Sequence, residues 1–452
     1  MMKFYPSFNN IFNDFKSLAG NQSGILEASA MPLVNFNGEV KLKSITGNMP
    51  KYHKTLLSQD MDIQYHIIGY GSHYEEALIK YTGESIERYS TIVAPELVKD
   101  KIVFSSYKEL SKKGKVLPLE YLNVFTENQR QYAKELHAII SEKEVNEDDI
   151  IGWIKCPSLF KKNEEIWVPA KMMFVGYKEN KELNEVNFIP SFSTGTASHK
   201  SLKKALINSL VEYIQIDAFM LTWYTKIKCK RVKIDNELVN NLLEEVNLGK
   251  DSSYEIIPIY MTLDEIPLPN FGVILKRKDK GMPYITFGVQ GGLDPVHSLT
   301  RGIMEAASIA YGPYFSTVYN PDGLKHVMNE DAKFLDLDSN VLFYAAPNKH
   351  EEKDNIMEEI IEGEILLSSI ENYKDKNIDE QISFLLKHLS KVSEYGVYLD
   401  ITPPETRNNG WYVTRVLLPE ILEMCIPEFP FANHPRMKKY GGVKNGYPHP
   451  MP

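Results

Sequence analysis

Cysteine is scarce in this chain, which has three among its 452 residues: Cys156, Cys229 and Cys425. They lie far apart and form no CxxC pair, so the sequence indicates neither a disulfide framework nor a cysteine-based zinc site. Thiol redox chemistry is therefore not expected.

Long apolar runs are missing too. No window approaches the roughly 20 consecutive apolar residues that a membrane-spanning helix needs. The N-terminal sequence MMKFYPSFNNIFNDFKSLAG also lacks the basic start, apolar stretch and small-residue cleavage site of a secretion signal. We therefore expect a cytoplasmic protein.

An excess of basic residues is absent as well. The chain has 51 Lys and Arg against 60 Asp and Glu, which gives a net charge of −9. Nonspecific nucleic-acid binding depends on clustered Lys and Arg that neutralise phosphates, and the short basic runs KKGK and KIKCKRVK are expected to be solvated faces. No nucleic-acid partner is expected.

Standard nucleotide-binding loops are also absent, since the chain contains neither GxGxxG nor GxxxxGK[ST]. What is present is an ordinary globular composition, 43% hydrophobic and 25% charged, in a chain long enough for two or three subdomains. Helical and strand-like segments alternate without a strict strand-helix repeat. This pattern predicts a mixed α+β fold rather than a TIM barrel or a Rossmann sheet.

Residues 1–60 carry scattered apolar groups among Asn, Ser and Gly. We expect them to form an irregular or briefly stranded segment that packs on the main domain, residues 61–452, or on a partner. Within the main domain, the sequence predicts strands within 150–160 and 166–177, acidic helices around 355–370 and 380–396, and further strands near 396–402 and 411–419.

Three segments have the strongest helical patterns: residues 74–90, 200–224 and 295–312. Each begins at a recognisable signal. Ser72 with Glu75 predicts a capping box for the first helix, and Ser198 or Thr196 can cap the second. The Asp-Pro pair at 294–295 predicts an N-cap followed by proline at the first helical position.

An acidic side chain recurs at the same register in these three helices. Positions spaced 0, 3, 4 and 7 share one face of a helix. The aligned positions are Lys80, Gly83, Glu84 and Glu87 in the first helix, Asn208, Val211, Glu212 and Gln215 in the second, and Arg301, Met304, Glu305 and Ser308 in the third. Apolar residues on the other sides of the first two helices are free to face a core.

Two interpretations of these acids are open. Glu84 and Glu87 can simply face solvent beside Arg88. Alternatively, carboxylates one turn apart, which repel each other, gather around a hard divalent cation, since Mg²⁺ takes oxygen ligands and usually shares them with phosphates. Repetition on three capped helices favours an acid-lined site, with Arg301 available, that holds Mg²⁺ and a triphosphate without a glycine-rich loop.

The chain ends in GYPHPMP, with Pro448, Pro450 and Pro452 at alternate positions. Proline fixes φ at about −65° and has no amide donor, so such a run is pre-extended and cannot join a helix or the middle of a sheet. The tail must either dangle, as chain ends usually do, or be inserted.

Two stretches resemble signatures of the YcaO family. GYGSHYEEALIKYTGESIERYS (69–90) resembles the first, a glycine-containing turn before a helix with a GExxER core. FSTGTASHKSLKKALINSLVEYIQIDAF (192–219) resembles the second, a Ser-Thr-Gly turn before an acidic helix that ends in Asp-Ala-Phe. Weaker matches follow in order: GWIKCPSLF with IWVPA, GGLDPVHSLTRGIMEA, YLDITPPE and WYVTRVLLPE. Together they span about residues 60–452.

This resemblance implies an ATP-dependent enzyme of peptide backbone chemistry. Its fold would be α+β, with mixed or antiparallel sheets and pseudo-repeated acidic helices around ATP and Mg²⁺. The implied metal and phosphate ligands are Glu84, Glu87, Glu212 and Gln215. The implied further nucleotide-binding residues are Arg88, Ser193, Thr194, Arg301, Glu305 and Arg415. Gln215 and Ile216 depart from the family, which often has Glu and Arg there, so one metal position is expected to be weaker or bridged by water.

Family members that make azoline rings are similar to this chain in ending with a Pro-x-Pro-x-Pro run that reaches the active site. The resemblance therefore implies a catalytic role for Pro448, Pro450 and Pro452. It implies a cyclodehydratase that converts Cys, Ser or Thr of a ribosomal precursor peptide into thiazoline or (methyl)oxazoline. In its separate, unfused form the chain is similar to the D proteins of streptolysin S-type cytolysin pathways.

The implied partners are an E1-like C protein that binds the leader peptide, the precursor peptide itself, a separate flavin dehydrogenase that oxidises the rings, and a second copy in a homodimer. Two rival functions stay open. One is a YcaO enzyme that forms thioamides or amidines from the same activated amide. The other is a nonenzymatic ATP-binding scaffold of a modification complex, which the departures at Gln215 and Ile216 favour.

Overall fold

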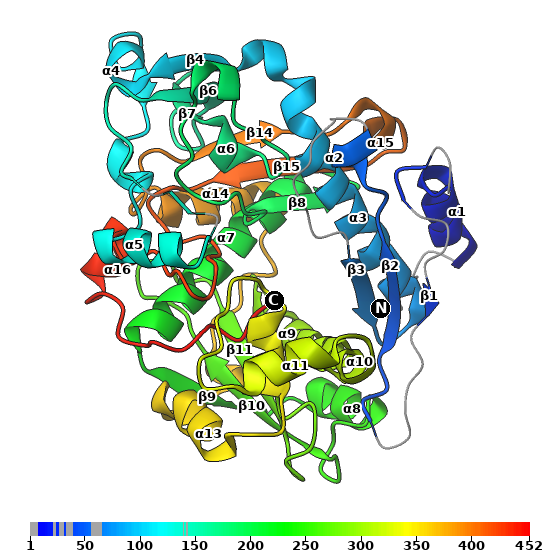
Figure 1. Ribbon diagram of the computed structural model, residues 1–452. Helices are drawn as coiled ribbons and strands as arrows, with labels where there is room; N and C mark the ends of the chain where they lie inside the picture. The colour runs from blue at the N-terminus through cyan, green and yellow to red at the C-terminus, as the bar shows by residue number, and fades with distance from the viewer. Residues whose placement is uncertain are drawn as a thin grey trace.

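Four β-sheets, with helices packed between and around them, form the part of the chain that the computed structural model describes (Figure 1). The described residues are 8–20, 24–26, 31–32, 39–55, 66–138, 140–141 and 143–452. None of the described helices combines the length and the hydropathy needed to cross a bilayer.

The strands are β1 (Met31–Pro32), β2 (Lys43–Asn48), β3 (His66–Gly71), β4 (Val103–Ser106), β5 (Lys115–Val116), β6 (Ile150–Pro157), β7 (Glu165–Pro169), β8 (Thr196–His199), β9 (Cys229–Lys233), β10 (Tyr254–Tyr260), β11 (Asn270–Arg277), β12 (Ile285–Gly291), β13 (Ile361–Leu366), β14 (Val397–Asp400) and β15 (Tyr412–Leu417). They form the sheets β1-β2-β3, β12-β11-β10-β9-β13, β14-β15-β8 and β4-β6-β7-β5.

The α-helices are α1 (Phe8–Leu18), α2 (Tyr52–Thr55), α3 (Tyr74–Leu97), α4 (Tyr107–Leu110), α5 (Glu127–Glu135), α6 (Ala170–Met173), α7 (Leu202–Thr225), α8 (Glu237–Glu245), α9 (Pro295–Ile309), α10 (Tyr311–Tyr319), α11 (Pro321–Met328), α12 (Ser339–Ala345), α13 (His350–Glu359), α14 (Ile378–Leu389), α15 (Pro404–Asn408) and α16 (Pro435–Lys439). Short 3₁₀ turns lie at Lys99–Lys101, Leu119–Tyr121, Lys181–Leu183 and Leu367–Ser369.

The α+β fold expected from the sequence is confirmed. Strands β5 and β7 pair in parallel, as do β9 and β13, and the other pairs between named strands are antiparallel. The three acidic helices are present as α3, α7 and α9, and the strands predicted around residues 150, 166, 397 and 412 are β6, β7, β14 and β15.

Helix α7 lies between two sheets. It contacts β8 and β15 of one sheet and β12 of the five-stranded sheet. Every residue from Tyr213 to Thr225 is buried, as expected for a helix whose C-terminal half is apolar on nearly all sides. Its acid-bearing N-terminal half is less buried and faces α3. The core of the molecule thus positions one of the three acidic helices directly.

Helix α9 packs on β11 and β12 of the five-stranded sheet. The approach is close because Gly288 on β12 has no side chain. A Cβ there would lie 2.4 Å from the Gly302 carbonyl oxygen and 2.6 Å from the Ala306 nitrogen. Asp294 caps this helix as predicted, accepting hydrogen bonds from the amides of Val296 and His297, and Pro295 follows at the first helical position.

The caps predicted for the other two helices are wrong. His73 is the N-cap of α3 and makes no side-chain cap bond, while Glu76 instead accepts a hydrogen bond from the Ser72 amide at 3.1 Å. Ser201 is the N-cap of α7, also without a side-chain bond. Ser198 is already used in strand β8, where its hydroxyl donates to the Gly83 carbonyl of α3 at 2.7 Å.

The acidic segment at 355–370 is helical only in its first part. Helix α13 ends at Glu359, and β13 follows, pairing in parallel with β9. The sequence IEGEIL alternates apolar and polar residues, which is the period of a strand, and Gly363 adopts φ +78°, a left-handed conformation that suits glycine. The expectation of a continuous helix there is wrong for these reasons.

The described part of the N-terminal segment packs on the main domain. Strand β2 pairs with β3 in antiparallel register, and α1 contacts α3, with the Phe15 and Tyr81 rings 6.2 Å apart. The expected boundary between residues 60 and 61 lies outside the described residues.

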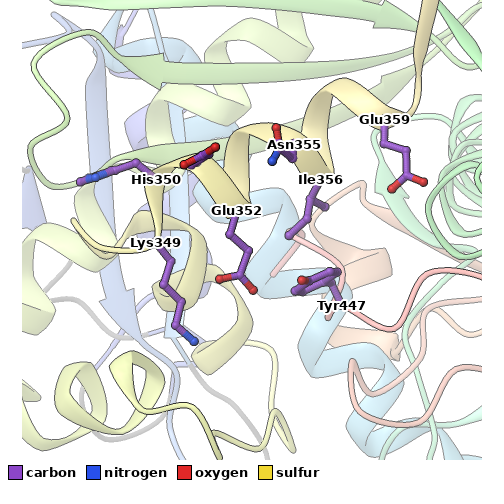
Figure 2. Close-up of a pocket in the computed structure, with 8 residues that line it drawn as sticks. Lys349, His350, Glu352, Asn355, Ile356, Glu359 and Tyr447 are labelled. Carbon is purple, nitrogen blue, oxygen red and sulfur yellow. The ribbon is translucent and has the colours of Figure 1, made fainter.

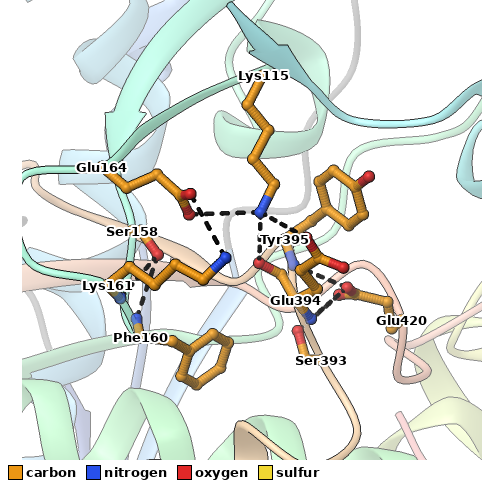
Figure 3. A network of polar contacts seen from close by, with 9 residues as sticks. All are labelled: Lys115, Ser158, Phe160, Lys161, Glu164, Ser393, Glu394, Tyr395 and Glu420. Atoms are coloured by element: carbon orange, nitrogen blue, oxygen red, sulfur yellow. Dashed lines mark hydrogen bonds and ion pairs between the residues drawn. The ribbon is translucent and has the colours of Figure 1, made fainter.

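A cavity of about 610 Å³ opens where α13 faces the C-terminal segment (Figure 2). Glu352, Ile356 and Glu359 of α13 line it from one side and Tyr447 from the other. A second polar region, on another part of the surface, ties the loop after α14 to its surroundings (Figure 3). There Glu420 accepts hydrogen bonds from the Glu394 and Tyr395 amides at 2.6 and 2.7 Å.

The buried ion pair between Asp217 on α7 and Arg436 on α16 holds the C-terminal segment to the core. Their side chains are 1% and 3% exposed, and the two carboxylate oxygens accept from Arg436 Nε and Nη2 at 2.7 and 2.6 Å. The Leu422 amide donates to the same carboxylate at 2.9 Å. Asp217 belongs to the Asp-Ala-Phe motif at the end of the second signature, within α7, so this motif serves to bind Arg436.

Replacing Asp217 by Ala should lower the stability of the folded protein by about 3 kcal/mol, because the buried Arg436 charge loses its bidentate partner and keeps only the Glu265 carboxylate, 3.0 Å from Nη1. The matched control is Asp148→Ala, which breaks an ion pair with Lys108 in which Asp148 is 75% exposed and should cost about 0–1 kcal/mol. Urea unfolding followed by circular dichroism measures both. Equal midpoints for the two variants would contradict the importance of this ion pair.

Candidate functional site

The turn formed by Ser193, Thr194 and Gly195 lies between α3 and α7. Arg88 of α3 donates through Nη1 to Ser193 Oγ at 3.1 Å, and Glu212 of α7 accepts a hydrogen bond from the Gly195 amide. Gly195 has φ +84°, and a Cβ there would lie 2.5 Å from the Tyr213 ring. Only glycine fits, so the turn presents this amide in one fixed place.

Arg415 of β15 supports the turn from the interior and is 1% exposed. Its Nη1 donates to the Thr194 carbonyl and, at 3.2 Å, to Thr196 Oγ1, while Nη2 donates to the Met172 carbonyl at 2.7 Å. The structure therefore places Arg415 behind the turn. Direct contact between Arg415 and a nucleotide stays a prediction.

Three carboxylates surround this turn: Glu84 and Glu87 on α3, and Glu212 on α7. Burial raises the pKa of Glu84, and the Arg88 charge opposes the rise. Burial and the neighbouring Glu212 charge raise the pKa of Glu87 well above its ordinary range, although the Ser198 amide donates to it. Burial raises the pKa of Glu212 to about 7, opposed by Arg415 and Arg88.

These acids are surrounded by protein and still reachable from solvent. The Glu84 and Arg88 side chains keep 36% and 35% of their surface exposed, and their ion pair is long, at 4.0 Å. Arg88 of α3 and Glu212 of α7 reach the same turn from different helices, and this geometry favours the clustered arrangement over the solvated one. The exposure leaves room for a polar ligand to approach.

The third acidic helix contributes Glu305, which accepts from the Val289 amide of β12 at 2.7 Å. Burial raises its pKa to about 7, opposed by this bond and by the Arg301 and Lys80 charges. Burial first, then the Glu305 charge, raises the pKa of Tyr70, and Glu84 adds to the effect. Tyr70 thus lies between the α3 and α9 acids and joins the two halves of the site.

Positive charge is present on the α9 side of the site. Lys80 pairs with Glu76 at 2.9 Å and lies 4.3 Å above the Tyr70 ring. Arg301 Nε is buried without a hydrogen-bond partner in the described structure. A buried donor of this kind is available to an anion, which fits the predicted position of Arg301 near phosphates.

Gln215 points away from the carboxylates and holds the edge of β12. Its Nε2 donates to the Val289 carbonyl at 2.8 Å, and its Oε1 accepts from the Gly291 amide at 2.9 Å. Both ends of the amide are therefore occupied, and metal ligation would require one of these bonds to break. Ser308 is also engaged, since its hydroxyl donates to the Glu305 carbonyl at 2.8 Å. A metal contact of Gln215 stays a prediction.

The donor set suits Mg²⁺ shared with phosphates. Within the described ranges, no three His, Cys, Asp or Glu side chains are grouped so that they alone could hold a metal ion. Mg²⁺ is usually held by one or two carboxylates together with waters and phosphate oxygens. Glu84, Glu87 and Glu212 repel one another and lack enough positive charge nearby, so a cation with anionic ligands of its own fits among them.

The C-terminal tail is inserted into the molecule. Pro448, His449 and Pro450 are buried, Met451 is 6% exposed, and Pro452 is exposed. Figure 1 draws the chain end inside the outline of the molecule. Of the two alternatives left open by the sequence, the dangling tail is therefore wrong for this structure.

Two adjacent residues, Met424 and Cys425, connect the tail to the turn. The Met424 amide donates to Thr194 Oγ1 at 3.2 Å, and the Cys425 carbonyl lies 3.0 Å from His449 Nε2. Burial lowers the pKa of His449 to about 4, so its ring is neutral and donates this bond. The tail is thus linked through two adjacent residues to the turn that Glu212 contacts.

Sequence reasoning missed two buried polar residues at the site. Glu423 is 6% exposed, and burial raises its pKa to about 7 although Arg415 lowers it. Asn340 is 0% exposed and contacts the tail. Asn340 begins the largely apolar run NVLFYAA, and Glu423 lies in LPEILEMCIP, which also contains Glu420. Polar residues in such runs could have marked buried contacts, since buried polar groups are usually hydrogen-bonded.

Comparisons with known proteins identify the family and the fold. A sequence model of YcaO cyclodehydratases, described as binding ATP and Mg²⁺, matches residues 68–422. No curated protein matches the chain.

Several solved structures share the fold. A heterocyclase in complex with substrate and cofactor has a TM-score of 0.71 at 15% identity, over 98% of this chain and 56% of the other. YcaO from Methanopyrus kandleri, bound with AMPPCP and Mg²⁺, has 0.62 at 12%, over 93% and 95%. The E. coli microcin synthetase McbBCD complex has 0.59 at 14%, over 96% and 99%.

The chain spans only 56% of the heterocyclase, so that protein has further parts without a counterpart here. At these identities the likeness shows the fold, while the sequence match covers most of the chain. From the two acidic signatures, the fold and the matched residues, it follows that the chain belongs to the YcaO family, whose members are described as binding ATP and Mg²⁺.

Proposed function

We propose that the chain is the cyclodehydratase subunit of a peptide-modifying system, converting Cys, Ser or Thr of a ribosomal precursor peptide into thiazoline or (methyl)oxazoline. The observation that carries the proposal is the buried tail, whose His449 contacts the Cys425 carbonyl, next to Met424, whose amide donates to Thr194 of the turn beside three carboxylates. The similar fold of a heterocyclase, and of a microcin synthetase solved with pro-MccB17 bound, supports the same class of chemistry.

The proposed reaction uses ATP as a co-substrate. The thiol or hydroxyl of the substrate adds to the carbonyl carbon of the preceding residue, and the resulting oxyanion attacks the γ-phosphorus of ATP and releases ADP. The carbon–oxygen bond then breaks, phosphate leaves, and the C=N bond of the ring forms. The nucleophile and the amide each give up one proton, so the peptide loses the elements of one water, whose oxygen departs in the phosphate.

The chain binds and orients the reacting groups. Glu84, Glu87 and Glu212 would hold Mg²⁺, which when bound neutralises charge on the transferring phosphoryl group. Arg88, positioned by Ser193, and Arg301, with its unpaired Nε, would contact phosphate oxygens. Arg88, Glu87 and Glu212 already contact Ser193, Ser198 and Gly195 without a ligand, so these three groups need little reorganisation during the proposed reaction.

We further propose that the chain works with separate proteins. An E1-like C protein would bind the leader of the precursor peptide, and a flavin dehydrogenase would oxidise the rings afterwards. The microcin synthetase McbBCD is itself a complex, which supports an assembly with partners. A homodimer and a cytoplasmic location stay predictions.

Replacing Glu212 by Gln should reduce ATP turnover by about 100-fold or more, because the substitution keeps the shape and removes a charge that holds the metal. The control is Glu96→Gln, an exposed acid on the last turn of α3 that pairs with Lys99 and should leave turnover unchanged. Phosphate release measures both variants. Normal turnover of Glu212→Gln would mean that this acid does not serve the metal.

The ligand-free protein should become less stable as the pH rises through 7. The folded-state pKa of Glu305 is raised from its ordinary 4.5 to about 7, so the folded protein keeps a proton that the unfolded chain has already lost, and deprotonation weakens the folded state. In Glu305→Gln this contribution disappears, so its melting temperature should fall less between pH 5 and pH 8. Glu362→Gln, on the exposed side of β13, is the control. Parallel curves for all three proteins would contradict the burial of a titrating Glu305.

Deleting residues 448–452 should slow ring formation by about 100-fold while ATP binding changes by no more than a factor of about two, because misplacing a group beside the reaction affects the rate more than binding. Mass spectrometry of a precursor peptide incubated with the chain, its partner protein and ATP measures rings, each of which removes one water. Equal loss of both activities, or of neither, would contradict the role of the tail. A gain in mass from sulfur exchange, or no change with the intact chain, would contradict the cyclodehydratase itself.

A further inference from the structure

The backbone of the tail is held through its carbonyl groups, and the His449 side chain adds a bond to the Cys425 carbonyl. Its prolines have no amide hydrogen to donate, and side chains of the core donate to its acceptors instead. Trp223 Nε1 donates to the Tyr447 carbonyl at 3.1 Å, and Tyr344 Oη donates to the Pro448 carbonyl at 2.7 Å. Asn340 Nδ2 donates to the carbonyls of His449 and Met451, both at 2.6 Å. We name Trp223, Asn340 and Tyr344 the tail clamp.

Asn340 makes the central contact of the tail clamp. Its single amide nitrogen carries two N–H groups, and these reach the carbonyls of His449 and Met451, two residues apart. Carbonyls two residues apart point to the same side of an extended chain, as they do along a strand. Asn340 therefore recognises the extended form that alternating prolines impose across Pro450.

The two clamp residues on α12 lie one helical turn apart, so Asn340 and Tyr344 share a face. Trp223 approaches from α7, and its ring meets that of Tyr344 edge to face at 5.9 Å. On its other side the tail presents His449, whose ring contacts Phe219 at 6.0 Å and Tyr224 at 6.3 Å. The tail is thus fixed from both sides.

The outer end of the tail clamp opens at the α13 cavity. Tyr447 lines that cavity opposite α13 (Figure 2), and burial together with a hydrogen bond to Glu352 raises its pKa. From there the chain enters the interior, and its last residues lie beyond Asn340. The tail clamp therefore fixes how far the tail reaches into the molecule.

The polar contacts of Asn340 show that it serves the tail and not the surrounding fold. Its Nδ2 contacts His449 and Met451 of the tail, and its Oδ1 has no hydrogen-bond partner among the described residues. Without the tail, the whole buried amide would be unpaired, which costs about 1–3 kcal/mol. If no tail were bound there, an apolar residue at position 340 would be more favourable than Asn, because it would leave no buried amide unpaired.

We propose that Asn340, with Tyr344 and Trp223, is a positioning residue of the proposed ring-forming reaction and acts solely through the tail. The inference rests on the proposed function, in which the tail reaches the site where the peptide reacts. The tail clamp sets how far the tail reaches into the molecule and in which register, and thereby the rate of ring formation. It takes no part in ATP binding.

The test uses Asn340→Leu, which removes both donors at similar volume, and Tyr344→Phe, which removes one hydroxyl from the same face. The control is Tyr373→Phe, which removes a hydroxyl that donates to Glu371, two residues away, and that does not belong to the tail clamp. We expect the kcat of ring formation to fall by about 10-fold or more in both clamp variants, with the KM for ATP changed by less than a factor of about two. The control should match the unaltered chain.

A double-mutant cycle separates a positioning role from a purely structural one. In a chain that lacks residues 448–452, Asn340→Leu should change ring formation no further, because the tail through which it acts is gone. An additional loss in the truncated chain, equal to the loss in the full chain, would overturn the proposal.

A second readout needs no enzyme activity, so it separates this proposal from the proposed function. Diethyl pyrocarbonate modifies accessible imidazoles, and His449 is 0% exposed whereas His137 is exposed and serves as an internal standard. We expect His449 to resist labelling in the unaltered chain and in Tyr373→Phe, and to be labelled in Asn340→Leu and Tyr344→Phe. Protection of His449 in both clamp variants would overturn the tail clamp. If His449 is labelled only in the clamp variants but the unaltered chain forms no rings, the tail clamp is supported and the proposed ring-forming reaction is rejected.

Discussion

The hold of Arg415 on the turn at residues 193–195 is the interaction on which the candidate site depends. A guanidinium is always charged, and burying a charge is costly unless hydrogen bonds compensate it. Arg415 donates through Nη1 and Nη2 to the carbonyls of Thr194 and Met172, while its Nε has no hydrogen-bond partner among the described residues, so the guanidinium ties the turn to the core. Gly195 can then offer its amide to Glu212, and Arg88 can be placed by Ser193, without any ligand present.

The carboxylates around this turn are gathered at a cost to the folded state. Burial raises the pKa of each, and mutual repulsion adds to the effect at Glu87. Perturbed groups of this kind cluster at functional sites, where strain in the free protein is relieved by the ligand. In the proposed function, a cation that arrives with phosphates would supply positive charge among these carboxylates and would leave Arg88 and Arg301 for the anionic oxygens.

The sequence predicted most of the fold because its strongest signals are local. The 0, 3, 4, 7 register on three helices, the Asp-Pro start of α9 and the alternating strands are all visible in short windows. The failures involve contacts that such windows do not contain. Ser198 could not cap α7 because it belongs to a strand packed on α3. Gln215 is aligned with the acids, yet tertiary packing turns it to β12, and Asn340 and Glu423 gain meaning only when distant segments meet.

Val289 of β12 limits how two of the acidic helices can move. Its amide binds Glu305 of α9, and its carbonyl binds Gln215 of α7. Two of the three acidic helices are therefore cross-linked through a single residue of β12, the strand at one edge of the five-stranded sheet. Sliding of α7 or α9 along this strand would break a hydrogen bond to Val289. Helix α3, which carries Glu84, Glu87 and Arg88 and packs on β2, β3 and β8, is not held by these two bonds.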